Sequence, residues 1–326
     1  MTLCLSEADI RAVLPMPDLI GAMESALTAF SSGGVVQPVR PVIEMGEAAF
    51  FAAMPGFVRD PPMLGAKLVT VIASNQARGL ATHQAAILLL DPETGVLLAV
   101  MDGRLITEMR TAAVSAVSMR HLARADAAVL AILGSGVQAR SHLAALTLER
   151  PFREVRAWSP TPAHLQKFVA EAAVPIRPCQ TAAEAVRGAD VIALTTASSE
   201  PVFANDWVAS GAHVISVGAC RPNQREMDPA LLARARVVVD SRAAAFQESG
   251  DIILGEREGR FAKEQVVELG EVAAGRAPGR APGRASPSEI TVFKSLGLAV
   301  EDLVAARLAY QRAREQGKGI EIHLGG

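Results

Sequence analysis

The sequence lacks three features that would assign it to particular protein classes. It has only three cysteines, Cys4, Cys179 and Cys220, and none belongs to a Cys-X-X-Cys spacing. An odd, scattered set argues against both a disulfide framework and a zinc site. The formal net charge is only −2, so we expect no basic surface for nucleic acid or anionic membranes.

Long apolar runs are also missing. No stretch reaches the ~20 apolar residues that a membrane-spanning helix needs. The first residues, MTLCLSEADI, carry acidic groups where a secretion signal starts with basic ones. We therefore expect a cytoplasmic protein without membrane or nucleic-acid partners. Its 326 residues are enough for two domains, each with its own core.

Residues 128–142 are the most informative stretch. An apolar run of strand type over 128–133 is followed by a glycine-containing turn and then by a helical pattern. This order predicts the first strand, turn and helix of a dinucleotide-binding unit. Gly134 permits the tight turn, Gly136 lets the backbone approach a pyrophosphate, and Ala139 is small enough for close helix packing. The predicted cofactor-binding turn is Gly134, Ser135, Gly136, Val137, Gln138 and Ala139.

The rhythm of strands and helices predicts two kinds of domain. From residue 127 onward strands and helices alternate, which is typical of a doubly wound parallel sheet, the Rossmann fold. Before that point successive strands lack intervening helices, so a separate α+β domain is expected. A last helix over 298–315 follows the sheet domain and could pack on the first one. The predicted early elements are helices in 6–32, strands at 39–44, 49–54, 65–72, 85–91 and 96–102, and a helix over 104–122. The repeat in 275–288 predicts an exposed loop.

Blocks spread along the chain resemble the ornithine cyclodeaminase/mu-crystallin family. They include VVQPVRP (35–41), MPG (54–56), KLVT (67–70), THQA (82–85), LLAVMDGRLIT (97–107), RTAAVSA (110–116), ILGSGVQA (132–139), GAHVISVGACRP (211–222), ESGD (248–251) and VFKSLGLAVED (292–302). The resemblance implies a substrate-binding and dimerisation domain over 1–122 with 296–326. It also implies a Rossmann domain over 123–295 and a homodimer. Family members divide among cyclodeaminases, alanine dehydrogenases, condensing enzymes and imine reductases.

Three cations of the first domain are candidate catalytic residues. Arg40 lies between two prolines, Lys67 begins an apolar strand, and Arg110 opens a helix of small residues. Solvated surface charge is the ordinary role of such residues. The resemblance implies instead a clamp for a substrate carboxylate, with Arg110 also near the cofactor and with Met54 and His83 as further substrate contacts. Lys67 is the candidate proton donor for an imine nitrogen, and a purely electrostatic role is the alternative.

The residue after the second Rossmann strand bears on the choice of cofactor. An NAD site usually places an acidic residue there to bind the ribose 2′-hydroxyl, whereas this chain has Ser159 with Thr161 nearby. Both hydroxyls can donate to a 2′-phosphate, so NADPH is favoured, with NADH possible. The resemblance implies further cofactor contacts from both domains. These are Thr82, Arg110, Thr111, Thr195, Val217 and Ser295.

Cys220 marks a departure from the cyclodeaminases, which by resemblance carry a catalytic Asp at this position. A neutral thiol cannot pair with an ammonium group as a carboxylate does, so cyclodeamination should be lost or poor. We expect Cys220 to be a small packing residue. The leading hypothesis is NAD(P)H-dependent reduction of a cyclic imino acid, Δ1-pyrroline-2-carboxylate or Δ1-piperideine-2-carboxylate, to L-proline or L-pipecolate. The alternatives are an alanine dehydrogenase-type enzyme, a cyclodeaminase and a non-catalytic ligand carrier.

Overall fold

The computed structural model describes residues 1–46, 48–276 and 283–324. The chain divides into two compact units, unit 1 with residues 1–110 and 298–326 and unit 2 with residues 111–297. The first division falls within helix α3 (Gly103–Leu122). The expected domain limits, 1–122 with 296–326 and 123–295, place all of α3 in the first domain and stay a prediction. Residues 277–282 of the repeat expected as a loop lie outside the described residues, and its described residues, 275–276 and 283–288, belong to no helix or strand.

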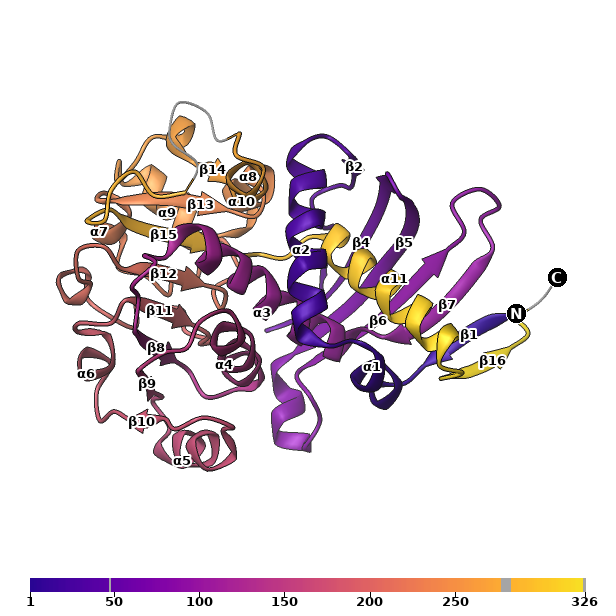
Figure 1. The fold of residues 1–326 in the computed structure, drawn as a ribbon, viewed down its shortest axis with the longest axis horizontal. Coiled ribbons are helices and arrows are strands. Elements are labelled where there is room, and N and C mark those ends of the chain that lie inside the picture. The colour runs from indigo at the N-terminus through magenta and orange to yellow at the C-terminus, as the bar shows by residue number, and fades with distance from the viewer. Residues whose placement is uncertain (47, 277–282, 325–326) are drawn as a thin grey trace. The chain divides into compact units, whose positions relative to one another are not determined.

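Unit 1 is built on an eight-stranded, mostly antiparallel sheet (Figure 1). Its order is β16-β1-β7-β6-β5-β4-β2, and β3 also pairs with β4. The strands are β1 (Thr2–Leu5), β2 (Val35–Val36), β3 (Val42–Glu44), β4 (Ala49–Arg59), β5 (Pro62–Ile72), β6 (His83–Leu90), β7 (Leu97–Asp102) and β16 (Ile320–Ile322). A 3-10 turn, η1 (Ala73–Arg78), precedes β6. The antiparallel pairing of β4 to β7 confirms an α+β region without crossover helices.

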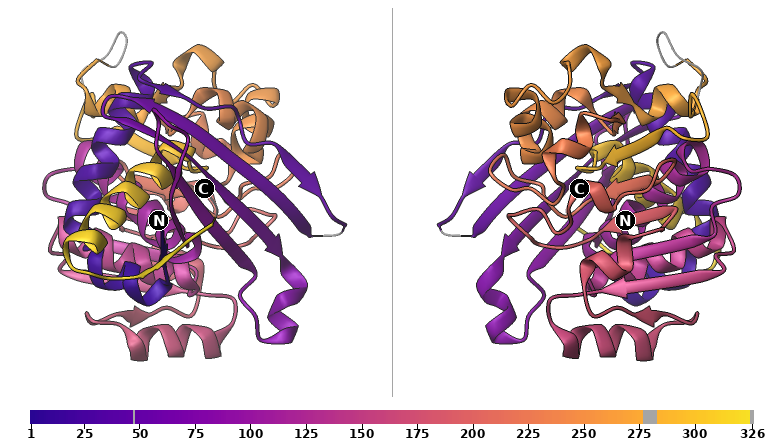
Figure 2. Two further views of the ribbon diagram at one scale, coloured as in Figure 1. Left: turned by 90° about the vertical axis from the view of Figure 1, so that its right-hand side faces the viewer. Right: turned by 90° about the vertical axis from the view of Figure 1, so that its left-hand side faces the viewer.

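Helices α1 (Glu7–Val13), α2 (Met16–Ser31) and α11 (Ala299–Glu315) accompany this sheet. A capping box between Ser6 and Asp9 starts α1. Helix α11 lies beside α2 and packs on β4, β5 and β6 (Figures 1 and 2). The C-terminal helix therefore completes the core of the N-terminal unit, as the sequence suggested. Within the described residues, no helix is long and apolar enough to cross a membrane.

Unit 2 contains an eight-stranded parallel sheet of order β10-β9-β8-β11-β12-β15-β13-β14. The strands are β8 (Val129–Leu133), β9 (Glu154–Trp158), β10 (Arg177–Pro178), β11 (Val191–Leu194), β12 (His213–Ser216), β13 (Ala235–Val239), β14 (Val267–Glu268) and β15 (Ile290–Lys294). The order reverses direction between β8 and β11, which is the switch point where open α/β sheets bind ligands. This topology confirms the predicted Rossmann-type, doubly wound domain.

The central strands of unit 2 are buried on both faces: every residue of β8, β11, β12 and β15 is buried. Their apolar sequences are typical of parallel strands covered by helices. The helices and turns entirely within unit 2 are α4 (Val137–Glu149), α5 (Pro162–Glu171), α6 (Ala182–Val186), η2 (Asn205–Trp207), α7 (Pro229–Leu232), α8 (Arg242–Glu248), α9 (Gly250–Arg257), η3 (Lys263–Gln265) and α10 (Leu269–Ala273).

Several predicted boundaries in unit 1 were wrong. The strand expected to end at Met54 continues through Pro55 as far as Arg59. Pro55 is an exposed residue of β4, and its strand pairs along its whole length with β5. The short strands β1 and β16 were not predicted, because strands of three or four residues carry too little periodicity to identify.

Candidate functional site

The predicted cofactor residues of unit 2 share one edge of the parallel sheet. Five of them are the first residue beyond the carboxyl end of a strand: Gly134 after β8, Ser159 after β9, Thr195 after β11, Val217 after β12 and Ser295 after β15. Because parallel strands end at the same edge, residues scattered over 160 positions gather there. In open α/β sheets this is the edge that binds ligands.

The turn after β8 has the backbone that the glycine pattern requires. Gly134 has φ +120°, and a Cβ there would lie 2.6 Å from Thr195 Oγ1 and 2.7 Å from the Thr195 carbonyl oxygen. Only glycine fits such a position. At Gly136, by contrast, a Cβ would meet nothing within 4 Å. The first glycine is therefore required by the fold, while the second leaves open space next to the backbone.

Helix α4 begins at this open space. Its N-cap is Gly136, which offers no side chain to the first amides of the helix. Unpaired amides and the helix dipole favour an anion at such an end. Arg140 and His142, further along α4, bind Glu171 and the Gln138 carbonyl oxygen instead. Together with the turn, these features fit the pyrophosphate of a dinucleotide.

Ser135 and Ser159 lie side by side at this edge. The Ser135 hydroxyl donates to the Ser159 hydroxyl at 2.9 Å, and Ser159 is buried. Thr161 is exposed and is the N-cap of α5, without a capping bond from its side chain. Nearby Arg156 binds Glu154 at 2.8 Å, so its charge is already paired. Neutral hydroxyls, not a carboxylate, stand where the ribose of a dinucleotide is recognised in this fold.

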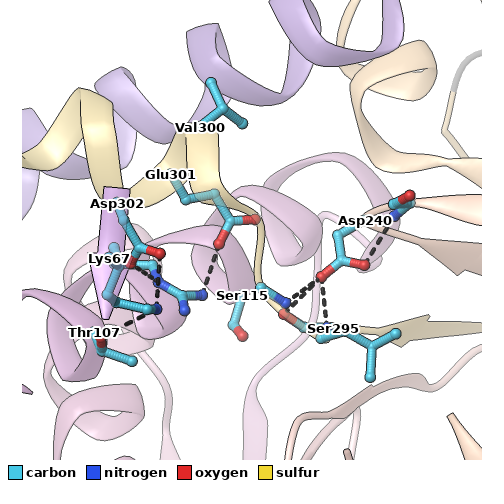
Figure 3. A network of polar contacts seen from close by, with 12 residues as sticks. Lys67, Thr107, Ser115, Asp240, Ser295, Val300, Glu301 and Asp302 are labelled. Carbon is cyan, nitrogen blue, oxygen red and sulfur yellow. Dashed lines mark hydrogen bonds and ion pairs between the residues drawn. The ribbon is translucent and has the colours of Figure 1, made fainter. Parts of the chain in front are cut away.

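Two buried carboxylates, neither predicted, hold the strand-end loops of unit 2. Glu226 accepts the amides of Thr196 at 2.8 Å and Gly218 at 2.7 Å. Asp240 accepts the Ser295 hydroxyl at 3.3 Å and the Gly297 amide at 2.7 Å (Figure 3). These bonds fix the loops by satisfying backbone donors that burial would otherwise leave unpaired. Glu226 lies in an irregular segment that gave no sequence signal, whereas Asp240 directly follows β13 and its place at a strand end was a signal that was not used.

Two further residues lie near this edge, Lys294 and Cys220. Lys294 is fully buried and binds Asp251 at 3.2 Å and the Ser216 hydroxyl at 3.1 Å, so it anchors β15 within the core. Cys220 was expected to pack inside but is exposed. The amides of Gly218 and Ala219 turn inward to Glu226, and the chain has reached the surface by Cys220.

Unit 1 brings Lys67 and Arg110 together in a buried charge cluster. Lys67 is 1% exposed and Arg110 is 3% exposed. The Lys67 ammonium lies 2.7 Å from Asp302, whose other oxygen accepts from Arg110 Nε at 3.0 Å (Figure 3). Arg110 Nη1 also donates to Glu301 at 2.7 Å. Surface solvation is therefore ruled out for both cations, since such residues are almost never buried unless they are paired.

The cluster perturbs the charges of its members. Burial lowers the pKa of Lys67 to about 8, partly offset by Asp302 and reinforced by Arg110 and Arg40. Burial raises the pKa of Asp302, but the Lys67 and Arg110 charges outweigh it and hold that pKa below its usual value. Asp302 is therefore a carboxylate near neutral pH, while Lys67 can gain or lose a proton there.

The other residues predicted near this site differ in burial and in their relation to the cluster. Burial lowers the pKa of His83 to about 4, with Lys67 and Arg110 acting in the same direction, so this imidazole is neutral. Met54 is buried and pairs with Lys67 in the register of β4 and β5. Half-buried Arg40 lies between β2 and β3, and exposed Thr82 directly precedes β6. Thr111 is buried in α3, as the first residue of unit 2.

Sequence reasoning missed the acidic half of this cluster. Glu301 and Asp302 stand in the first turn of α11 and are fully buried. Acidic residues in a first turn ordinarily serve the helix dipole at the surface. The sequence did contain a signal for burial. The two acids are followed directly by the apolar residues LVAA (303–306) and not by a polar turn. Thr107, which accepts from Lys67 at 3.4 Å, was also missed.

Comparison with known proteins places the chain in a family. Residues 1–317 match the model of the ornithine cyclodeaminase/mu-crystallin family. Ketimine reductase mu-crystallin of Rattus norvegicus is 45% identical over 90% of this chain and 91% of that protein. Δ1-Pyrroline-2-carboxylate reductase of Bacillus cereus is 35% identical over 99% of this chain and 100% of that protein.

A solved structure shows the same fold. The Δ1-pyrroline-2-carboxylate reductase of Thermococcus litoralis, in complex with NADH and L-proline, superposes with a TM-score of 0.95. The match covers 98% of this chain and 100% of that one, at 36% identity. With the family model spanning both units, the chain belongs to the ornithine cyclodeaminase/mu-crystallin family.

Proposed function

We propose that this protein is an oxidoreductase that reduces the C=N bond of cyclic imino acids. Its substrates would be Δ1-pyrroline-2-carboxylate and Δ1-piperideine-2-carboxylate, giving L-proline and L-pipecolate. The cluster of Lys67 and Arg110 supports this proposal, because two cationic side chains buried in unit 1 can bind a carboxylate ligand. The similar proteins named ketimine reductase and Δ1-pyrroline-2-carboxylate reductase support it.

A nicotinamide dinucleotide is the cofactor that unit 2 fits. Gly134, Gly136 and the first amides of α4 would hold the pyrophosphate, and the Ser135–Ser159 pair would face the ribose. When bound, the reduced nicotinamide supplies the hydride for the reaction. NADPH is the preferred form in our proposal, because Ser159 presents no negative charge to a 2′-phosphate. Thr82, Arg110, Thr111, Thr161, Thr195, Val217 and Ser295 are proposed as additional cofactor contacts.

The residues of unit 1 would bind and polarise the substrate. Arg40 and Arg110 would hold its carboxylate through planar guanidinium groups. Lys67 would keep a proton at the imine nitrogen, since a protonated imine accepts hydride far more readily. Neutral His83 and apolar Met54 would border the ring without adding charge. Positioning and charge stabilisation would therefore account for catalysis.

A substrate panel tests the proposal directly. Oxidation of NADPH and NADH would be followed with five- and six-membered cyclic imino acids and with pyruvate plus ammonia. With ornithine, release of ammonia in the presence of the oxidised cofactor would be followed, because cyclodeamination causes no net oxidation or reduction of the cofactor. We expect turnover of the cyclic imines without added ammonia and faster turnover with NADPH. A requirement for ammonia would favour an alanine dehydrogenase. Efficient conversion of ornithine would favour a cyclodeaminase, and tight cofactor binding without any turnover would favour a carrier.

We propose that the protein forms a homodimer through the sheet of unit 1. Lys67 faces α11, so alternate residues point to the opposite face of the sheet. That face is mostly apolar, and Leu68 on it is 36% exposed. Its large members include Phe51, Phe57, Leu64, Leu68, Leu88, Leu90 and Val100. A second copy of the chain would cover this apolar patch. Light scattering should therefore give twice the mass of the monomer. Leu68→Asp places a charge in the patch and should shift the measured mass toward that of the monomer. The cytoplasmic location stays a prediction.

A further inference from the structure

The ligand-binding edge of the unit 2 sheet has two sides that meet at β8. Strands β9 and β10 lie on one side of β8, and β11, β12 and β15 lie on the other. With a pyrophosphate at the turn after β8 and the adenosine ribose facing Ser159 after β9, the rest of a dinucleotide would extend toward β11 and β12. The loops that follow these two strands would therefore border its nicotinamide half.

One buried carboxylate binds both of these loops. Glu226 is 0% exposed. Its Oε1 accepts from the Thr196 amide, after β11, at 2.8 Å and from the Thr196 hydroxyl at 2.7 Å. Its Oε2 accepts from the amides of Gly218 at 2.7 Å and Ala219 at 3.3 Å, both after β12. Each loop is therefore held by a different oxygen of the same carboxylate.

The two loops approach each other closely where Glu226 binds them. A Cβ at Gly218 would lie only 1.8 Å from the Thr196 carbonyl oxygen and 2.4 Å from Glu226 Oε1. This close approach of one backbone to another restricts residue 218 to glycine. A change in the contacts of Glu226 would therefore displace both loops and not one alone.

A third strand joins this carboxylate through buried side chains. The Ser216 hydroxyl, at the end of β12, donates to Glu226 Oε2 at 3.1 Å and accepts from Lys294 Nζ at 3.1 Å. Lys294 is the last residue of β15 and also binds Asp251 at 3.2 Å. Burial lowers the pKa of Lys294, but the charges nearby, with Asp251 foremost, outweigh it and hold that pKa above its usual value. Glu226 is thus connected to the ends of β11, β12 and β15.

We propose that Glu226 is a positioning residue for the nicotinamide half of the cofactor. This inference rests on the proposed function, because it takes unit 2 as the site of a nicotinamide dinucleotide. Since its carboxylate is fully buried, Glu226 acts through the backbone of the two loops. Glutamine has one accepting oxygen and one donating amide group, so in Glu226→Gln one of the loops would lose its hydrogen bonds.

Calorimetry with matched probes tests the proposal. NADPH and 2′-phospho-ADP-ribose differ only in the uncharged reduced nicotinamide, as do NADH and ADP-ribose, and the pair that the wild type binds more tightly is used. The wild type should bind the dinucleotide about tenfold more tightly than the fragment. Glu226→Gln should lower the affinity for the dinucleotide about tenfold, because buried donors lose their acceptor, and should leave the affinity for the fragment unchanged. Glu256→Gln removes the same charge from an exposed position of α9 and should change neither affinity.

Each outcome decides the role of Glu226. Equal losses for the dinucleotide and the fragment would indicate a general structural role and overturn the proposal. An unchanged affinity for the dinucleotide in folded Glu226→Gln would also overturn it, as would equal affinities of the wild type for the two probes. If Glu226→Gln does not fold, Ser216→Ala decides in the same way. It removes one donor to Glu226 and the link to Lys294, and should weaken binding of the dinucleotide alone.

The reductase activity can fail separately, because binding is measured without turnover. A selective loss of dinucleotide affinity in Glu226→Gln, together with no reduction of cyclic imines by the wild type, would contradict only the proposed reaction. Reduction of cyclic imines with unchanged affinities in the variant would contradict only the role of Glu226. A wild type that binds none of the probes would contradict both proposals.

Discussion

The two halves of the functional machinery recognise their ligands in opposite ways. The turn after β8 uses backbone, with glycines that provide a positive φ at Gly134 and open space at Gly136. The cluster of unit 1 uses buried side-chain charge, joined across 191 and 192 positions of sequence. Backbone recognition depends on a few consecutive residues, whereas charge recognition depends on the balance of a folded network. The two should therefore respond differently to substitution.

The largest effect is expected from Arg110→Ala. This change removes a substrate ligand and leaves Glu301 and Asp302 buried with less positive charge. Breaking a buried charge network costs about 3–5 kcal/mol of unfolding free energy, and loss of the contact should cost about 2–5 kcal/mol in kcat/KM. Denaturant titration and steady-state kinetics measure the two quantities.

A matched control lies on the same helix. Arg120 forms a more exposed pair with Glu149, so Arg120→Ala should cost about 1 kcal/mol or less and leave kcat/KM unchanged. Equal losses in the two variants would show that burial of the cluster has no special importance.

Next in size is a pair of glycine substitutions in the turn. Gly134→Ala forces a side chain into a positive φ and against Thr195, so it should destabilise unit 2 by about 1–3 kcal/mol and abolish tight dinucleotide binding. Gly136→Ala meets no clash and should cost at most about 1 kcal/mol as an N-cap change, yet still weaken the dinucleotide. Thermal melts with and without NADPH separate these effects. Equal destabilisation by both variants would refute the distinction between the glycines.

A smaller effect is expected from Ser159→Asp. A carboxylate beside Ser135 would repel a 2′-phosphate and could accept from a ribose hydroxyl. The ratio of kcat/KM for NADPH to that for NADH should fall about tenfold or more. Ser159→Ala removes the hydroxyl without adding charge and should change the ratio less. If Ser159→Asp leaves the ratio of kcat/KM for NADPH to that for NADH unchanged, the 2′-phosphate binds at another place.

The smallest effect concerns pH. With Lys67 acting as an ammonium, kcat/KM should be level below pH 8 and fall above it, because its pKa is about 8. Asp302→Asn removes the carboxylate that raises this pKa, so the alkaline limb of the kcat/KM profile should move to lower pH.

The stability of the folded state should change with pH in the opposite direction. The folded state binds fewer protons than the unfolded one between about pH 8 and 10.5, so Lys67 makes stability rise over that window. An alkaline limb that stays in place in the variant would exclude Lys67 as the titrating group.

The contrast between the two halves explains what could be predicted. The turn, the alternation of unit 2 and the residues following each strand were predictable, because each depends on local pattern and on the shared edge of a parallel sheet. The cations Lys67 and Arg110 were identified through resemblance and local context. Glu301 and Asp302 were not, since their role exists only once α11 packs against β5. Glu226 and Asp240 were missed because the amides that they bind lie far away in the sequence and are identified only in the folded unit 2.

The central claim is that the cluster of unit 1 recognises the carboxylate of a cyclic imine. The most direct measurement compares NADPH oxidation with Δ1-pyrroline-2-carboxylate and with 1-pyrroline, which is the same ring without the carboxylate. Loss of a charge-paired group should lower kcat/KM by about a hundredfold or more. Comparable reduction of the two rings would contradict the assignment of Lys67, Arg110 and Arg40 to substrate binding.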